Sequence, residues 1–346
     1  MWPQGGSSEP MASSGYETTI ASVVIDLRDG ETSQEVSYPD CVLSLLRQNR
    51  SVLKRYTNSS WVDFPRIEQV IKRVGHDRAQ INASFPTAIH AVDGVKVAVE
   101  LPIAPNEFSR SASSPLTKAG LQRLDELLGA PPSSKSLVVN DRIALLHRLA
   151  QTIDAIHRCG IVLGDLSGGN ILWSVDPVPS VYLIGVDSAV PMGAVLRDKL
   201  EISDGWDPMT TVQRFTPEYD AVLLAMTAVR LLSGDRSKRL DPGAVHLPEN
   251  QRLESEVRRL VQEAANGCPP SAAEWMSSLA DEVVGRGRDC AVEVAVDRLL
   301  MQGKWQQALD LDGRHSVGNP RLAIAREHLS AMHLAGQAEM AVSTDA

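Results

Sequence analysis

The sequence contains few cysteines, no excess of basic residues and no long apolar run. Its four cysteines are scattered and form no CxxC pair. Because zinc sites and disulfide frameworks need clustered or regularly spaced cysteines, we expect reduced, buried thiols. No segment holds about 18 uninterrupted apolar residues, and no basic stretch followed by an apolar one opens the chain. We therefore expect a cytoplasmic protein that does not bind membranes.

The charge balance is acidic. The chain carries 34 Lys and Arg against 43 Asp and Glu, a formal net charge of -9. This gives no electrostatic footprint for nucleic acid or anionic lipid, so we expect no nucleic-acid partner. A small anionic ligand would need a local basic site. The 346 residues are enough for a two-lobed domain with an appendage, since single hydrophobic cores stop growing at about 250 to 300 residues.

The residue pattern changes along the chain and divides it into four parts. Residues 1–18 are rich in Gly, Ser, Pro and Thr and predict a flexible leader. Residues 19–101 contain short strand-type runs such as CVLSLL, SVLKRY and VKVAVEL, with one helical pattern, PRIEQVIKRV. Residues 102–283 turn to amphipathic helices, and residues 284–346 to helical hairpins that faintly resemble tetratricopeptide units. The pattern predicts an α+β chain with a β-rich first part and a larger helical second part.

The most specific motif follows the helical stretch NDRIALLHRLAQTIDAIHRCG. It reads GDLSGGN, holds Asp165 and Asn170, and precedes two short strand patterns, ILW and VYLIGV. This order of helix, D-x4-N loop and strand pair resembles the catalytic loop and metal-binding strand of the protein kinase superfamily. The resemblance covers about residues 20 to 283. It implies a two-lobed kinase-like fold that uses ATP and Mg²⁺.

The resemblance also implies roles in this stretch. Asp165 would be the catalytic base or hydroxyl-orienting residue, and Asn170 a magnesium ligand. The usual metal-binding Asp aligns with Gly185, and Asp187 lies two residues further on. Asp187 either replaces that ligand or is a solvated turn residue. Asp220, at the start of an apolar helix, is expected to anchor the backbone of the loop.

Leu163, Gly164 and Ser167 occupy the loop positions that kinases usually fill with His, Arg and Lys. The lost Lys removes one contact to the γ-phosphate. Some bacterial kinase-like families carry the same G-D-L-x-x-x-N loop, as do the aminoglycoside and choline phosphotransferases. The loop alone therefore does not distinguish these branches.

In the β-rich part, SVLKRY resembles the strand that carries the phosphate-anchoring Lys, here Lys54. Glu68, fourteen residues on, would hold Lys54 as an ion pair, although an exposed Glu on an amphipathic helix explains this position equally well. GETSQEVSY can be laid over a glycine-rich phosphate loop that begins at Gly30. A Glu in that loop would repel a nucleotide.

VKVAVELP resembles the strand that leads into the interlobe hinge. This alignment places Val99 at the gate of the adenine pocket and Glu100 as the first hinge residue. Pro102 cannot donate a backbone hydrogen bond to adenine. The segment from Ser188 to Gln213 would be the activation segment, with Thr210 or Thr211 as a phosphorylation site.

Three functions are compatible with these residues. The first is a protein-kinase-like domain that transfers the γ-phosphate of Mg-ATP to Ser or Thr hydroxyls of a protein substrate. The second is a pseudokinase that binds nucleotide or a protein partner and serves as a scaffold. The third is a small-molecule phosphotransferase of the aminoglycoside or choline type. Gly185 favours the second, because it removes a metal ligand.

Overall fold

The computed structural model describes residues 24–26, 32–46, 51–110, 120–129, 137, 139–175, 179–195, 215–248, 250–280 and 309. The flexible leader predicted for residues 1–18 lies outside this part of the chain, as do Gly30, Thr210 and Thr211. The helical extension predicted for residues 284–346 also lies outside it, apart from residue 309.

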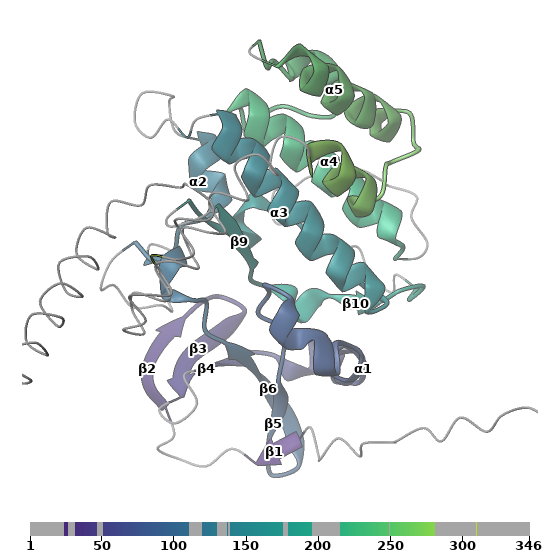
Figure 1. Ribbon diagram of the computed structural model, residues 1–346. Helices are drawn as coiled ribbons and strands as arrows, with labels where there is room; N and C mark the ends of the chain where they lie inside the picture. The colour runs from purple at the N-terminus through teal and green to yellow at the C-terminus, as the bar shows by residue number, and fades with distance from the viewer. Residues whose placement is uncertain are drawn as a thin grey trace, which may run out of the picture.

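A six-stranded sheet dominates the first part of the chain (Figure 1). In sequence its strands are β1 (Val24–Asp26), β2 (Thr32–Ser37), β3 (Cys41–Leu46), β4 (Ser51–Tyr56), β5 (Ala88–Val92) and β6 (Val95–Pro102). The order across the sheet is β1-β5-β6-β4-β3-β2. Strands β2 to β6 pair antiparallel, whereas β1 pairs parallel with β5.

One helix, α1 (Phe64–Val74), follows β4 and covers one face of this sheet. It begins at the cap residue Asp63, whose carboxylate accepts a hydrogen bond from the Arg66 N–H at 3.1 Å. Its apolar stripe packs against Val52, Ile89 and other residues of the sheet. The burial of such side chains stabilises the contact by about 1.5–3 kcal/mol each. The short 3-10 helices η1 (Ser59–Trp61) and η2 (Gly75–Gln80) flank α1.

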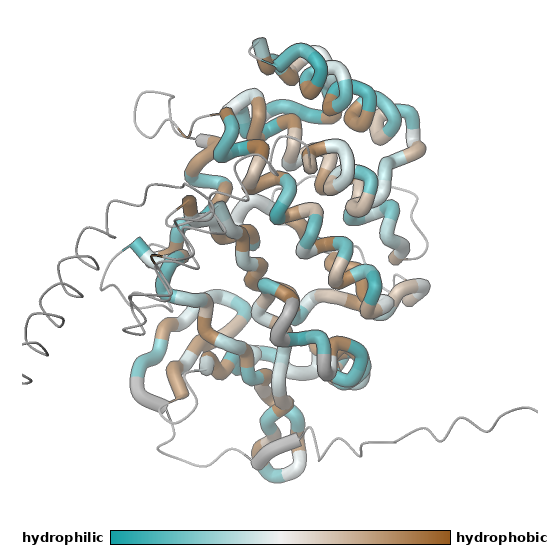
Figure 2. The backbone as a smooth tube through the Cα atoms, in the orientation of Figure 1, coloured by the Kyte–Doolittle hydropathy of each residue, from teal (hydrophilic) through white to brown (hydrophobic). Residues whose placement is uncertain are grey.

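Helices form most of the second part. They are α2 (Leu124–Gly129), α3 (Val139–Arg158), α4 (Pro217–Ser233) and α5 (Gln251–Ala265), and residues 272–280 are also helical. Helix α4 is buried along nearly its whole length, because its sequence is apolar on all sides. It ends at Gly234, which takes a left-handed φ of 69°. Hydrophobic and hydrophilic residues alternate along α5 (Figure 2), and the hydrophobic ones, such as Leu253, Val257 and Leu260, are buried, so the polar face of this helix is exposed.

Small elements lie between the sheet and the helices. Strand β7 (Ile161–Val162) pairs with β10 (Val190–Pro191), and β8 (Ile171–Ser174) pairs with β9 (Ser180–Leu183). The predicted strand pair is therefore confirmed. The short helices η5 (Gly168–Asn170) and η6 (Val186–Ser188) follow β7 and β9, while η3 (Asn106–Phe108) and η7 (Pro242–Ala244) lie in connections.

The sheet part is joined to the helical part by direct contacts. The Ser84 N–H donates to the Leu183 carbonyl at 2.8 Å, and the Leu183 N–H donates to the Asn82 carbonyl at 2.9 Å. Arg73 of α1 donates to the Gly160 carbonyl at 2.7 Å. The predicted α+β class is confirmed, with a β-rich first part and a helical second part. Among the described residues, no helix combines the length and the apolar character needed to cross a membrane.

Candidate functional site

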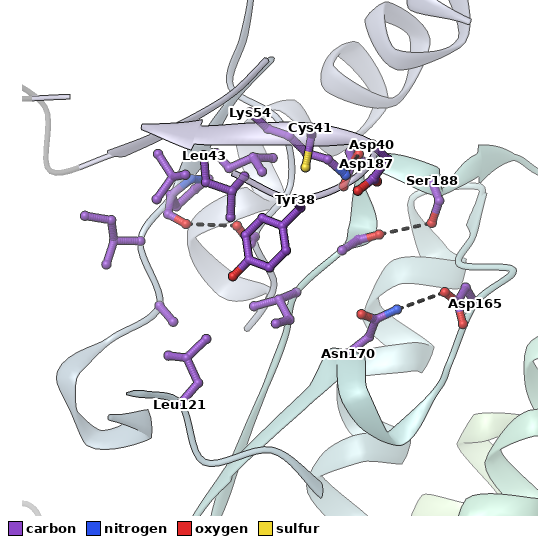
Figure 3. A pocket seen from close by; sticks show the side chains of 18 residues that line it. Tyr38, Asp40, Cys41, Leu43, Lys54, Leu121, Asp165, Asn170, Asp187 and Ser188 are labelled. Carbon is purple, nitrogen blue, oxygen red and sulfur yellow. Dashed lines mark hydrogen bonds and ion pairs between the residues drawn. The ribbon is translucent and has the colours of Figure 1, made fainter. Parts of the chain in front are cut away.

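A cavity of about 370 Å³ lies between the sheet and the helical part (Figure 3). One wall is apolar and is formed by Leu43, Val52, Leu101, Ile103, Leu121 and Ile184. The opposite end is polar and is formed by Asp40, Lys54, Asp165, Asn170 and Asp187. Four of the residues singled out from the sequence, Lys54, Asp165, Asn170 and Asp187, thus line one cavity although they come from distant parts of the chain.

The loop that carries Asp165 is held by one buried carboxylate. Asp220, at the start of α4, is fully buried and accepts hydrogen bonds from the Leu163 N–H at 2.8 Å and the Gly164 N–H at 2.9 Å. The predicted anchoring contact is confirmed. Gly164 has a φ of 76°, which a residue with a side chain rarely adopts, so the sharp turn before Asp165 favours glycine here.

His157 is a third partner of Asp220 that sequence reasoning missed. Its Nε2 lies 2.9 Å from Asp220 Oδ2 and donates to that oxygen. His157 comes from the last turn of α3, six residues before Leu163. The sequence offers one signal for it, a histidine at the end of the helix that leads into a loop whose usual histidine is absent.

Asp165 and Asn170 are neighbours across their loop. The Asn170 amide donates from Nδ2 to Asp165 Oδ2 at 2.9 Å (Figure 3). The Asn170 carbonyl accepts a hydrogen bond from the Ile184 N–H at 2.9 Å, which joins the loop to the segment after β9. Both side chains reach the cavity, as the D-x4-N spacing predicts.

The Asp187 carboxylate accepts two side-chain hydrogen bonds at the polar end of the cavity. Its Oδ2 accepts from Lys54 Nζ at 2.8 Å and from the Tyr56 hydroxyl at 2.7 Å. Burial by itself would raise the pKa of the Asp187 carboxyl, but the charge of Lys54 and the hydrogen bonds from Lys54 and Tyr56 outweigh it and hold this pKa below its usual value. Asp187 is therefore not a solvated turn residue, since only 7% of its side chain is exposed.

Tyr56 was not predicted as a site residue. It lies two residues after Lys54 on β4, so the two side chains point to the same face of the sheet. The β-strand period is the signal that could have identified it. Burial and the Asp187 charge raise the pKa of the Tyr56 hydroxyl, which therefore stays protonated as a donor.

Arg66 of α1 also holds the Asp187 region. Its guanidinium donates to the Asp187 carbonyl at 3.1 Å and to the Ser188 carbonyl at 3.0 Å. Asp187 is thus tied to the sheet through its side chain and to α1 through its backbone. No local sequence signal connects Arg66 with a segment more than 120 residues away.

Glu68 differs from its predicted role. It lies on α1 as expected, but its carboxylate forms an ion pair with Lys96 of β6 and not with Lys54. The reason is that Asp187 contacts the Lys54 ammonium from the segment after β9. The resemblance implies an ion pair between the strand and the helix, whereas here Lys54 of β4 pairs with Asp187 of the post-β9 segment (Ile184–Ser188).

The hinge strand also differs in detail. Val99 pairs with Lys54 in the sheet and is fully buried in the core under α1. The Glu100 side chain accepts from Ser51 at 2.6 Å and contacts His90 Nε2 at 3.1 Å, while its carbonyl accepts from the Thr87 N–H at 2.8 Å. Glu100 is thus engaged away from the cavity, because strand alternation gives the cavity to Leu101.

The hairpin tip that reaches the cavity is not the predicted glycine loop. Thr32–Ser37 form strand β2, and the turn lies at Tyr38, Pro39 and Asp40. The Tyr38 N–H donates to the Cys41 carbonyl at 2.8 Å, and Pro39 has no N–H. The tip contains no glycine. Its sequence signal, a Pro-Asp pair between two strand patterns, is a common turn signature.

Cys41 follows this tip and lines the cavity. Burial raises the pKa of its thiol to about 11, so the thiol is protonated and unreactive near neutral pH. Cys41 matches the expected buried thiol. Cys159 is half-buried and Cys268 is exposed, so burial does not extend to the other two cysteines that the structure describes.

The cavity fits a magnesium ion poorly. Gly185 offers no carboxylate, and Asp187 Oδ2 already accepts from two donors. Gly185 has a φ of 70°, and a Cβ built there would lie 2.9 Å from Asn170 Oδ1. The Asn170 amide therefore fills the space that a side chain at 185 would need. Within the described ranges, no three His, Cys, Asp or Glu side chains gather closely enough to bind a metal ion.

A scan against protein-family models and a search of curated proteins both give no match to this chain.

Proposed function

We propose that this chain is a protein-kinase-like binding protein whose cavity takes a purine nucleoside or nucleotide and whose phosphoryl transfer is weak or lost. The single observation that carries the proposal is the contact of Asp187 with Lys54 and Tyr56. In a phosphotransferase, the anchoring Lys would contact phosphates and a metal-binding Asp would contact magnesium. Here Lys54 and Asp187, which lies two residues beyond the aligned position, contact each other.

The kinase-like reading is supported by the arrangement around the cavity. A sheet with one covering helix packs against a helical part, and the D-x4-N loop lies between them. The apolar wall and the nearby backbone groups of Ile103 and Ala104 suit a flat heterocycle, since ligand pockets combine apolar walls with a few polar groups. Ile103 and Ala104 keep the N–H groups that Pro102 lacks.

The reduced transfer is supported by three local features. Gly185 removes a metal ligand, Asp187 is bonded to Lys54 and Tyr56, and the hairpin tip has no glycine with which to approach phosphates. Each weakens the charge neutralisation on which phosphoryl transfer depends.

A second candidate is a Ser/Thr protein kinase with retained activity on Mg-ATP. Asp165 beside Asn170 at the cavity favours it, because an active kinase needs these two side chains in this loop. The small-molecule phosphotransferase has no comparable support among the contacts described above.

The test combines binding and transfer on the full chain. Thermal-shift titrations with adenosine, ADP and ATP should raise the unfolding temperature. Radiolabelled ATP should give no transfer to the chain itself or to generic basic protein substrates above the level of Asp165→Ala. Transfer that Asp165→Ala abolishes would replace the binding proposal with the kinase. The absence of any shift with every purine compound would overturn the nucleotide proposal.

A further inference from the structure

We propose that this cavity selects a purine nucleoside over its triphosphate and binds it without a divalent cation. The inference rests on the proposed function, which supplies the purine. It adds the ligand class. The polar end of the cavity has a net negative charge and offers few hydrogen-bond donors to a phosphate group.

The first argument is the charge balance. The charged side chains among the described residues that line the cavity are Asp40, Asp165, Asp187 and Lys54. Three carboxylates against one ammonium give a formal balance of -2. The ammonium is paired with Asp187 at 2.8 Å, so it offers an incoming phosphate little uncompensated positive charge.

Arg66 is a second cation close to this end of the cavity. It does not line the cavity, and its two terminal nitrogens donate to the carbonyl oxygens of Asp187 and Ser188. Arg66 Nε is buried and has no hydrogen-bond partner among the described residues, but the side chain is not part of the cavity lining, so a phosphate held in the cavity would not contact it. Arg66 therefore positions the post-β9 segment and does not form an anion site.

The second argument concerns backbone donors. Phosphate loops work because successive free N–H groups point at the anion. At the hairpin tip, the Tyr38 N–H donates a hydrogen bond to the Cys41 carbonyl, and Pro39 has no N–H. Asp40 adds a negative charge. The tip thus repels the group that a glycine-rich loop would attract.

The third argument concerns the cation that usually screens a triphosphate. Magnesium is bound by one or two carboxylates together with phosphate oxygens. Asp187 accepts from Lys54 and Tyr56, and the space beside Gly185 is filled by the Asn170 amide. Without a well-placed ion, the phosphates would meet the carboxylates unscreened, whereas an uncharged nucleoside would need only the apolar wall.

The experiment is isothermal titration calorimetry of the full chain with adenosine, AMP, ADP and ATP, each in EDTA and in excess magnesium. We expect adenosine to bind equally well in both buffers, and affinity in EDTA to fall with each added phosphate to a total of about tenfold. Asp40→Asn should narrow the ratio of adenosine to ATP affinity about threefold, because it removes one carboxylate that repels the phosphates.

Asp93→Asn is the matched control. It makes the same charge change on the β5–β6 turn of the same sheet, at a residue that does not line the cavity. Asn tolerates the φ of 51° found there. This variant should leave the affinity ratio unchanged.

The outcomes separate this inference from the proposed function. Tighter binding of magnesium-ATP than of adenosine would overturn the nucleoside preference and leave nucleotide binding intact. An equal narrowing in Asp40→Asn and Asp93→Asn would overturn the assignment of the preference to the hairpin tip. If no purine compound binds in either buffer, both proposals fail together.

Discussion

The two sides of the cavity hold their aspartates in different ways. The anchored loop (Leu163–Asn170) is fixed through its backbone by Asp220, which leaves the Asp165 side chain at the cavity. The post-β9 segment (Ile184–Ser188) is fixed through the carboxylate of Asp187 itself, which Lys54 and Tyr56 hold. One side thus places an acid for chemistry or binding, whereas the other uses its acid to connect the sheet to the helical part.

This difference gives Asp187 a structural role that the spacing of the motif does not reveal. The contacts of Asp220 stay within the helical part, because His157, Leu163 and Gly164 all belong to it. The side-chain contacts of Asp187 come from β4, and the backbone there is held by Arg66 of α1. Removing the Asp220 carboxylate therefore tests contacts within the helical part, whereas removing the Asp187 carboxylate tests contacts between the sheet and the helical part.

The largest expected effect is from Asp220→Ala. The change leaves the buried N–H groups of Leu163 and Gly164 and the imidazole of His157 without their acceptor, at a cost of about 4 kcal/mol in the free energy of unfolding. Urea denaturation followed by circular dichroism measures this loss. The control is Asp235→Ala, which removes an exposed carboxylate that also accepts a backbone N–H, from Ser237 at 2.8 Å. Equal losses in the two variants would contradict the anchoring role.

The second effect comes from Lys54→Met, which leaves Asp187 buried with Tyr56 as its remaining side-chain donor. We expect a loss of about 3 kcal/mol in the free energy of unfolding, because a buried charge without its ionic partner is costly. The double variant Lys54→Met, Asp187→Leu should recover most of that loss, since apolar residues of similar volume often replace a buried ion pair without cost. A double variant as unstable as Lys54→Met would contradict this account.

The pH dependence of the same pair has a defined sign. The pKa of Asp187 is lowered, so its contribution to stability is complete above the usual value of 3.8 and is lost as the pH falls through the lowered value. For Lys54, burial by itself would lower the pKa, but the charge of Asp187 raises it above 10.5, so its contribution is lost only as the pH rises through that raised value. The free energy of unfolding of wild type, minus that of the double variant, should stay constant near neutral pH and fall in acid below pH 3.8. A wild type that gains stability relative to the double variant in acid would contradict the lowered pKa.

Much of the candidate site could be predicted from local patterns. The helix, the D-x4-N loop and the strand pair brought Asp165, Asn170 and Asp187 to one place, and the strand pattern SVLKRY placed Lys54 opposite them. Asp165, Asn170 and Asp187 lie in the short connections next to β7, β8 and β9, and Lys54 lies within β4, so a correct element order is enough to bring them together. The same reasoning predicted the Asp220 contacts.

The partners of these residues could not be predicted in the same way. The predicted partner of Lys54 was Glu68 on α1, but the acid that contacts it is Asp187, more than 130 residues later, and which acid reaches Lys54 depends on tertiary distances. Other misses had a local signal. The two-residue period of β6 separates Glu100 from Leu101, and Pro39-Asp40 marks the hairpin tip that the alignment from Gly30 missed.

A smaller effect on the free energy of unfolding is expected from changes at Gly185, which lies in the post-β9 segment on the Asp187 side of the cavity. Gly185→Ala should cost about 1–2 kcal/mol in the free energy of unfolding, because φ is 70° and the new Cβ meets the Asn170 amide. Gly185→Asp should cost at least as much, because its larger side chain meets the same Asn170 amide and adds a charge near Asp187, but it returns a carboxylate to the cavity. Only the Asp variant should gain magnesium-dependent affinity for ATP in calorimetry. The same gain in the Ala variant would show that the missing carboxylate is not what limits the site.

The smallest effect is expected from Tyr56→Phe, which removes one of the two donors to Asp187 Oδ2 and keeps the ring. The ring still packs edge-on against Phe64, with centroids 6.1 Å apart, so the loss should be about 1 kcal/mol for one hydrogen bond. The stability lost in acid through Asp187 should be smaller in this variant and complete at a higher pH than in wild type, because the Tyr56 hydrogen bond helps to lower the pKa of Asp187. Comparison of urea midpoints between pH 3 and pH 7 (roughly the range over which a carboxyl titrates) measures both effects. An unchanged acid limb in Tyr56→Phe would mean that Lys54 alone fixes the ionisation of Asp187, and the link between sheet and post-β9 segment would reduce to that one ion pair.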